Sequence, residues 1–169
     1  MKLYSFDMSG LSNPHVTMPE EVVIYAPVWD CVKQVIEDGK IAVTSEIYTE
    51  MCDITGEVGK CIKDNKAALR LEVGDPSWNS ALYIQHFNRM RKDHKEWIAE
   101  YAFKSPAKTI CLPDLTAIAL GKALGLPVVS MESSAKGSPK HKRIPDICEL
   151  ENVLHYEFND FLKIEGIGK

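Results

Sequence analysis

Short apolar segments of strand length alternate with longer segments of helical periodicity along the chain. The clearest apolar segments are residues 2–6, 41–43 and 127–131, and residues 69–73 and 153–155 are further candidates. Strands that are separated by helices require right-handed crossovers, which produce a mainly parallel sheet with helices on both faces. We therefore expect an α/β fold with a central sheet of four to five strands.

Helix signals fill the intervals between these strands. Pro27 and Gly39 fit the start and the end of one helix, and Pro113 and Gly125 fit those of another. Ser45 is suited to cap the helix that follows residues 41–43. The remaining helices are predicted through residues 58–62, from Asp75 to a charged and exposed end at residues 89–95, around Trp97 and Tyr101, from Pro145, and over residues 157–162.

Two segments are predicted as loops. Ser9, Gly10, Asn13 and Pro14 are turn formers that follow the first strand closely. Residues 132–143 combine Gly, Ser and Pro with several basic residues, which is typical of an exposed loop.

Length and composition favour one cytoplasmic domain over residues 1–169. The 169 residues suffice for a single core, and no apolar run approaches the ~20 residues that cross a bilayer. The first residues lack the apolar stretch of a signal peptide. Five widely spaced cysteines, an odd number, fit reduced thiols. The net charge of −4 argues against wrapping of nucleic acid by bulk positive charge.

Five acidic residues occupy positions that a parallel sheet brings together. Ligand sites in such folds form at the carboxyl ends of the strands. The candidates lie after predicted strands or near the starts of helices: Asp7, Glu50, Asp114, Glu132 and Asp146.

Crowded carboxylates point to a divalent cation. Their charges repel one another and raise their pKa values unless a cation is bound. Oxygen donors suit Mg²⁺ or Mn²⁺, and such an ion activates water and stabilises charge on an attacked phosphorus. The cluster therefore predicts metal-dependent hydrolysis of phosphodiesters.

Each acid also has a purely structural interpretation. Asp7 and Ser9 could form a turn at a strand end. Asp114 and Asp146 are good first-turn acids that complement a helix dipole. Glu50 and Glu46 would usually form a solvated helix face. Only the joint placement of the acids favours a catalytic site.

Four segments resemble the signature blocks of PIN-domain proteins, in the family order: YSFDMS at 4–9, VTSEIYTEM at 43–51, PDLTAIALGKALGLPVVSME at 113–132 and RIPDIC at 143–148. The resemblance is greatest to a bacterial subgroup long filed as a domain of unknown function. PIN-domain proteins are mostly VapC-type toxin ribonucleases that cut RNA with Mg²⁺ or Mn²⁺. The resemblance thus implies an RNA substrate and a small antitoxin partner, and it leaves a homodimer open.

The resemblance also implies roles for individual residues. It places metal-binding acids at Asp7, Glu50 and Asp114 and leaves the fourth position open between Glu132 and Asp146. Met8 replaces the family's usual threonine, so a hydroxyl that orients Asp7 has to come from Ser9 or is absent.

The basic segment lies between two candidate acids, so an RNA backbone could cross it on the way to the metal site. A plain solvated loop is the alternative. Trp78 and Trp97 fit the core better than a base-stacking surface. The candidate substrate-binding residues are Ser9, Ser130, Lys140, Lys142 and Arg143.

Two other functions compete with a ribonuclease. A degenerate PIN-like module would bind RNA or a protein without cutting, as the departures at Met8 and Glu132 suggest. An aspartyl phosphatase of the haloacid dehalogenase kind would use Asp7 as its nucleophile. That family needs a second aspartate where Ser9 stands, which disfavours it.

Overall fold

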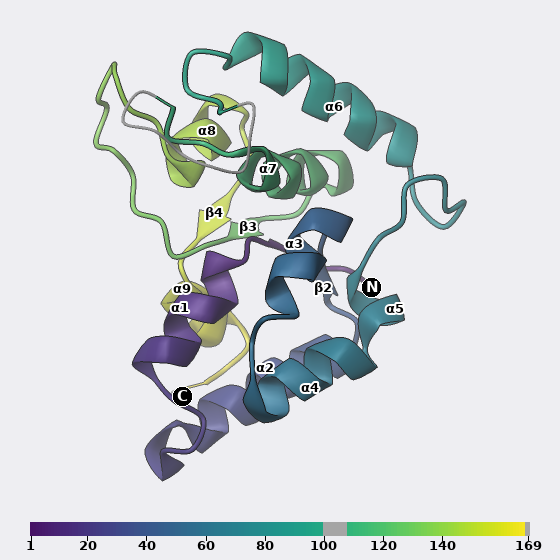
Figure 1. Ribbon diagram of the computed structural model, residues 1–169, viewed down its shortest axis with the longest axis vertical. Helices are drawn as coiled ribbons and strands as arrows, with labels where there is room; N and C mark the ends of the chain where they lie inside the picture. Colours follow the sequence, from purple (N-terminus) through teal and green to yellow (C-terminus); the bar gives the residue numbers. More distant parts are fainter. Residues whose placement is uncertain (100–107, 168–169) are drawn as a thin grey trace.

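A four-stranded parallel sheet forms the centre of the computed structural model, which describes residues 1–99 and 108–167 (Figure 1). The strands are β1 (Tyr4–Phe6), β2 (Ile41–Ala42), β3 (Val128–Val129) and β4 (His155–Tyr156). They lie in the order β2-β1-β3-β4, and every neighbouring pair is parallel. The predicted α/β fold is thus confirmed, with four strands.

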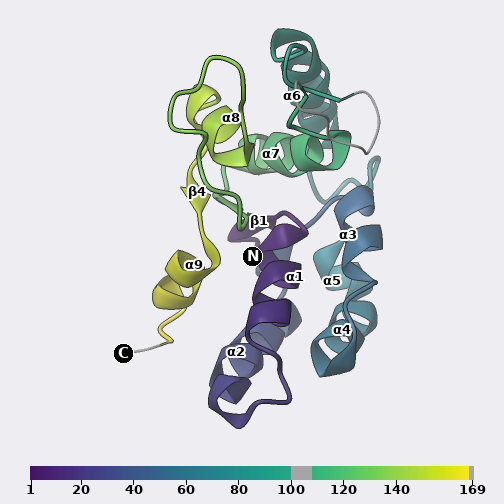
Figure 2. The same ribbon diagram turned by 60° about the vertical axis from the view of Figure 1, so that its left-hand side comes forward.

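Alternation along the short strands separates two cores. In β1, Tyr4 and Phe6 pack with residues of α2 (Ala26–Glu37) and α9 (Phe158–Ile164). Ser5 faces the other way, and its hydroxyl donates to the carbonyl of Ala117 in α7 (Leu112–Leu124) at 2.8 Å. Helices therefore cover both faces of the sheet, as Figures 1 and 2 show from two directions.

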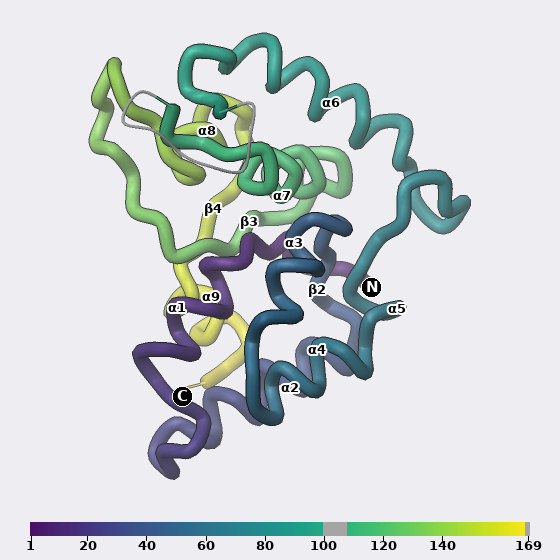
Figure 3. Tube along the Cα trace, viewed as in Figure 1, coloured from purple at the N-terminus to yellow at the C-terminus, as the bar shows by residue number. Residues whose placement is uncertain are grey.

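The other helices complete the two layers. Their bounds are α1 (Ser9–Thr17), the 3-10 helix η1 (Val23–Tyr25), α3 (Ser45–Met51), α4 (Gly56–Asp64), α5 (Lys66–Leu69), α6 (Ser80–Asp93) and α8 (Ile144–Leu150). In Figure 3 the chain builds the layer around α2, α4 and α5 and then crosses to the layer of α6, α7 and α8.

The loop predicted after Asp7 is wrong, because these residues form α1. Leu11 is fully buried, and Gly10 lies so close to β3 that an added Cβ would be 2.8 Å from the carbonyl oxygen of Val129. Pro14 lies inside this helix, where a proline ordinarily disfavours helix formation. Packing of the buried face against the sheet therefore overrides the local turn signals.

Helix starts differ from the prediction at two places. Thr44 rather than Ser45 caps α3, and its hydroxyl accepts a hydrogen bond from the amide of Ile47 at 3.4 Å. Helix α6 begins at Ser80 instead of Asp75, because Asn79 supplies the cap.

Three segments of the prediction change their structure. Residues 69–73 form no strand beyond a single bridge between Val43 and Arg70. The helix predicted around Trp97 is also wrong, because Ile98 bridges to Ile110. Tyr101 lies outside the described residues. The last strand is shifted from residues 153–155 to His155–Tyr156.

The charged end of α6 is more than the exposed helix end that its sequence predicts. Met90 is fully buried, and His94 is only 9% exposed. Arg89 and His94 both contact the carboxylate of Glu151, at the end of α8. This contact joins α6 to α8. Within residues 1–99 and 108–167, no helix is both long and apolar enough to cross a membrane.

Candidate functional site

The carboxyl ends of the central strands bring the first candidate residues together. Phe6 of β1 is in register with Val129 of β3. Asp7 and Ser130, the next residue after each strand, therefore lie side by side. The amide of Asp7 donates to the carbonyl of Val129 at 3.0 Å. The start of α7 reaches the same edge, since the hydroxyls of Thr116 and Thr44 are 2.8 Å apart.

Asp7 and Asp114 are two buried acids whose negative charges repel each other. Asp7 is 4% exposed, and Asp114 is 6% exposed. Burial and then the charge of Asp114 raise the pKa of Asp7 to about 7, and Glu132 adds to this effect. Hydrogen bonds from Ser9 act in the opposite direction. Three of the predicted carboxylates therefore lie within electrostatic reach at one sheet edge.

Both buried acids are held by neighbouring donors. The amide of Ser9 donates to Asp7 Oδ2 at 3.0 Å, and the Ser9 hydroxyl donates to the same oxygen. The orienting hydroxyl expected near Asp7 thus comes from Ser9. Asp114 Oδ2 accepts a hydrogen bond from the amide of Cys111 at 2.9 Å, as a third-position acid of a helix often does.

Comparison with known proteins gives one family. The model of a family described as a domain of unknown function (DUF4411) matches residues 4–168, nearly the whole chain. The chain belongs to the DUF4411 family. No curated protein matches it, and neither does any solved structure.

In this DUF4411 chain the two alternatives for a fourth acid have different surroundings. Glu132 Oε2 accepts a hydrogen bond from the amide of Ile144 at 3.0 Å, and Glu132 also acts on Asp7. Asp146 Oδ2 accepts from the amides of Ala135 and Arg143, and its other oxygen accepts from the Ser134 hydroxyl at 2.6 Å.

The hydrogen bonds of Asp146 determine its ionisation. Burial alone would raise its pKa, but the bonds from Ser134, Ala135 and Arg143 and the charge of Lys142 hold the pKa below its ordinary value. Asp146 thus closes the loop of residues 134–143 as a fixed carboxylate. This geometry corresponds to the structural interpretation of a first-turn acid.

Glu50 is half-buried on α3, six residues beyond the cap at Thr44. Its helix packs against α7, which carries Asp114. The charges of Asp114 and Glu132 raise the pKa of Asp7. Glu50 is thus linked to this edge through its helix.

The predicted substrate-binding residues differ in their exposure to solvent. Lys140 and Arg143 are exposed, whereas the half-buried Lys142 places its ammonium 5.7 Å from the ring centre of Trp97. Ser130 is fully buried, so it is unsuited to direct contact with a large ligand. Its hydroxyl is 2.8 Å from His155 Nε2.

His155 is a polar residue near the site that the sequence did not single out. Burial lowers its pKa, although Glu157, Glu132 and Asp160 act in the opposite direction. Its place on the last strand, beside the strand that precedes Ser130, was the only available signal. The last strand was predicted over residues 153–155 and is observed at His155–Tyr156.

The donors at this edge suit a hard divalent ion. Among the described residues, no group of three or more His, Cys, Asp or Glu side chains is arranged to hold one ion. Mg²⁺ needs only one or two direct carboxylates and keeps several waters. Asp7 and Asp114, as buried oxygen donors, meet that requirement.

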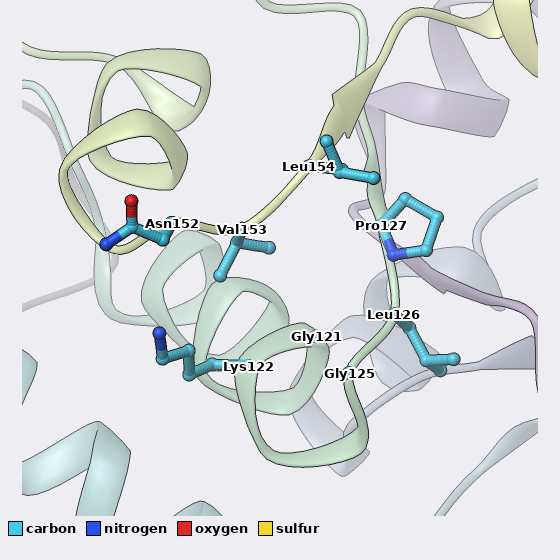
Figure 4. A pocket seen from close by; sticks show the side chains of 8 residues that line it. All are labelled: Gly121, Lys122, Gly125, Leu126, Pro127, Asn152, Val153 and Leu154. Carbon is cyan, nitrogen blue, oxygen red and sulfur yellow. The ribbon is translucent and has the colours of Figure 1, made fainter.

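A separate hollow lies at the opposite edge of the sheet. Its volume is about 380 Å³, and it lies at the amino ends of β3 and β4, between Gly125 and Asn152 (Figure 4). Lys122 on its wall donates to the carbonyl of Glu151 at 2.5 Å. This hollow is lined by other residues than the acids described above.

Proposed function

We propose that this protein is a metal-dependent endoribonuclease that hydrolyses RNA phosphodiester bonds at Asp7, Asp114 and Glu132. The observation that carries the proposal is the burial of Asp7 and Asp114, from separate elements, at the carboxyl edge of a parallel sheet. Two buried like charges are unfavourable on their own, and a bound cation removes that penalty. The PIN-like sequence blocks support the same conclusion.

In this proposal Mg²⁺ or Mn²⁺ is held by Asp7 and Asp114. The ion would supply an activated water and stabilise charge on the phosphorus. Ser9 orients the carboxylate of Asp7, and the amide of Cys111 orients that of Asp114. Exposed Lys140 and Arg143 attract the RNA backbone.

The remaining acids receive different roles. Glu132 takes the fourth acidic position, because its charge raises the pKa of Asp7 and because it lies two residues after Ser130. Asp146 fixes the loop instead, because its oxygens accept three hydrogen bonds. Glu50 remains a further metal ligand in the proposal, on the strength of the PIN resemblance.

Incubation with RNA tests the activity directly. Total RNA and single-stranded DNA are incubated with wild type, Asp7→Asn and Asp114→Asn in Mg²⁺, Mn²⁺ or EDTA. Asp64→Asn, an exposed change on α4, is the control. We expect cleavage of RNA by wild type and control with either metal, and none by the two site variants. Intact RNA in all metal-containing reactions, or cleavage indifferent to EDTA, would refute the proposal.

A degenerate PIN-like binding module is the second candidate. It is favoured by the bond that Glu132 already makes to the amide of Ile144. Titration calorimetry with Mn²⁺ separates the two candidates. The ribonuclease requires Mn²⁺ binding that is lost in Asp7→Asn, whereas the module requires RNA binding without metal-dependent cleavage.

The proposal extends to the setting of the protein. Its five cysteines, all within the described ranges, are free thiols, which fits the reducing cytoplasm. We place the protein there as the toxin of a toxin-antitoxin pair, with a small antitoxin as partner and a homodimer as the assembly. Light scattering tests the dimer, and a short open reading frame beside the gene, with co-purification of its product, tests the antitoxin.

A further inference from the structure

A second hollow lies beside the basic loop, on the side of the molecule that carries α7 and α8. Its volume is about 470 Å³, and its lining residues are Thr109, Ala135, Ser138, His141 and Arg143. None of these lining residues is acidic, and Lys136, Lys140 and Lys142 lie next to them in the chain. The hollow is thus a pocket with cationic and hydroxyl groups on its wall.

The wall of this pocket is fixed by hydrogen bonds to side chains. One oxygen of Asp146 accepts from the amide of Ala135 at 2.9 Å and from that of Arg143 at 2.8 Å, so it joins two parts of the wall. Thr109 donates its hydroxyl hydrogen to the carbonyl of Lys142 and accepts from the Lys142 amide. The pocket therefore needs little ordering before a ligand binds.

The polar groups of the pocket suit an anion. Ser138 Oγ accepts hydrogen bonds from the amides of Lys140 and His141 at 3.3 and 3.2 Å, which leaves its own hydrogen for a further acceptor. Arg143 is exposed at the pocket and supplies a forked, permanently charged donor. The two acids that flank the loop, Glu132 before it and Asp146 on α8, both accept backbone amide hydrogens.

The pocket is a near neighbour of the acidic cluster. Glu132, which acts on Asp7, bonds to the amide of Ile144, and Ile144 directly follows the pocket residue Arg143. A chain of phosphates that passes the acids would therefore have a second phosphate within reach of this pocket.

We infer that this pocket binds a backbone phosphate of single-stranded RNA, next to the bond that is cut. The inference rests on the proposed function in taking RNA as the ligand. Inorganic phosphate carries the same charged oxygens as an RNA backbone phosphate, so it is the other ligand that the pocket could bind. The binding needs no metal ion.

Fluorescence anisotropy of a labelled single-stranded RNA oligonucleotide tests the inference. Wild type, Arg143→Gln and Ala135→Leu are compared in EDTA, where no metal-dependent cleavage takes place. Arg143→Gln removes a charge-assisted bond to phosphate, so we expect about tenfold weaker binding. The slope of log affinity against log salt should fall in magnitude by about 0.7, because the variant neutralises one phosphate fewer on the single strand.

Two further variants make the test specific. Ala135→Leu fills the pocket without a change in charge and should also weaken binding about tenfold, whereas Lys92→Gln, an exposed change on α6, should leave it within about twofold. Circular dichroism confirms the fold of each variant. If Ala135→Leu fails to fold, Arg143→Gln decides. Equal affinity and salt slope in wild type and Arg143→Gln would overturn the inference.

Competition by inorganic phosphate identifies the source of the ligand. RNA that binds far more tightly than phosphate, with both depending on Arg143, supports the inference. Phosphate that binds as tightly as RNA would overturn RNA as the ligand. The proposed function fails separately: Arg143-dependent binding in EDTA without any metal-dependent cleavage removes the nuclease and leaves the pocket.

Discussion

Ser9 donates both its amide and its hydroxyl hydrogen to one oxygen of Asp7. The same hydroxyl accepts a hydrogen bond from the amide of Met131 at 3.1 Å. One side chain thus joins the end of β1 to the end of β3, where the sheet presents its acids. This bridge and the buried acid next to it give the first predictions.

Replacement of Ser9 by alanine should destabilise the protein. The variant leaves the amide of Met131 without its partner and removes one bond to Asp7, so we expect the free energy of unfolding to fall by about 1–2 kcal/mol. Urea denaturation measures it. Ser12→Ala, in the same helix but with an exposed hydroxyl contact at 3.4 Å, is the control and should change stability by less than about 0.5 kcal/mol. Equal values for both variants would contradict the bridge.

Replacement of Asp7 by asparagine should stabilise the metal-free protein and abolish its response to metal. The variant removes a buried charge beside Asp114, so at pH 8 in EDTA we expect a gain of about 2–4 kcal/mol. Wild type should gain about 2.7 kcal/mol from Mn²⁺ at a hundred times its dissociation constant, and the variant nothing. Thermal unfolding with and without Mn²⁺ measures both effects. A metal-free variant less stable than wild type would contradict the repulsion.

The stability of the metal-free protein should fall with rising pH because of Asp7. Its pKa is about 7 in the folded protein, against 3.8 for the ordinary group, so the folded state binds more protons between these values. The contribution of Asp7 is therefore fully present below pH 3.8 and is lost as pH rises to about 7, with a total on the order of 4 kcal/mol. Urea denaturation of wild type and Asp7→Asn in EDTA, from pH 4 to 8, isolates it. A constant difference between the two proteins would refute this prediction.

Asp146→Asn should loosen the basic loop. An amide has a single acceptor oxygen, so it leaves part of the set formed by Ser134, Ala135 and Arg143 unpaired, at a cost of about 1–3 kcal/mol. Trypsin should then cut after Lys136 or Lys140 faster than in wild type. Asp160→Asn, in the first turn of α9 and paired with exposed Lys163, is the matched control. Unchanged cleavage in Asp146→Asn would show that the loop is held by other contacts.

Glu151→Gln should weaken the attachment of α6. Burial alone would raise the pKa of Glu151, but Arg89 and His94 hold it below its ordinary value. Because Arg89 is partly exposed, we expect a loss of about 2–3 kcal/mol instead of the larger cost of a fully buried pair. Hydrogen exchange should rise mainly in α6. Asp93→Asn, which breaks only the exposed pair with Arg89, should have little effect.

Strand and helix order could be predicted from the sequence because the strongest signals are local. Pro27 and Pro113 lie in the first turns of α2 and α7, and Gly125 ends α7 with a positive φ of 66°. Such residues act through their own backbone geometry, so no knowledge of distant contacts is needed. The apolar segments at β1 and β3 are likewise clear.

The errors lie where distant residues decide the local structure. Helix α1 has turn-forming residues, but Leu11 packs into the core and Gly10 rests on the carbonyl of Val129. Ile98 lies in a segment whose apolar spacing predicts a helix, and yet it pairs with Ile110. The sequence alone does not show which distant residue such a residue contacts.

The acidic residues of the candidate site could be predicted from the sequence. Their hydrogen-bond partners could not. Asp7 and Asp114 follow from strand ends and helix starts. Three features depend on bonds between residues far apart in the chain: the contact of Ser130 with His155, the bond from Ile144 to Glu132, and the loop closure by Asp146. Asp114 and Asp146 look alike in sequence, each after a proline, and only their surroundings separate them.

The order of strands in the sheet has a consequence for synthesis of the chain. β1 is made first and ends up between β2 and β3, but β3 begins only at Val128. Until that residue has left the ribosome, one side of the first strand stays unpaired. The end of the sheet at which Asp7 and Asp114 lie is then still incomplete. The emerging chain therefore carries an open strand from Phe6 until Val128 has been made, and the acidic edge is completed only after that point.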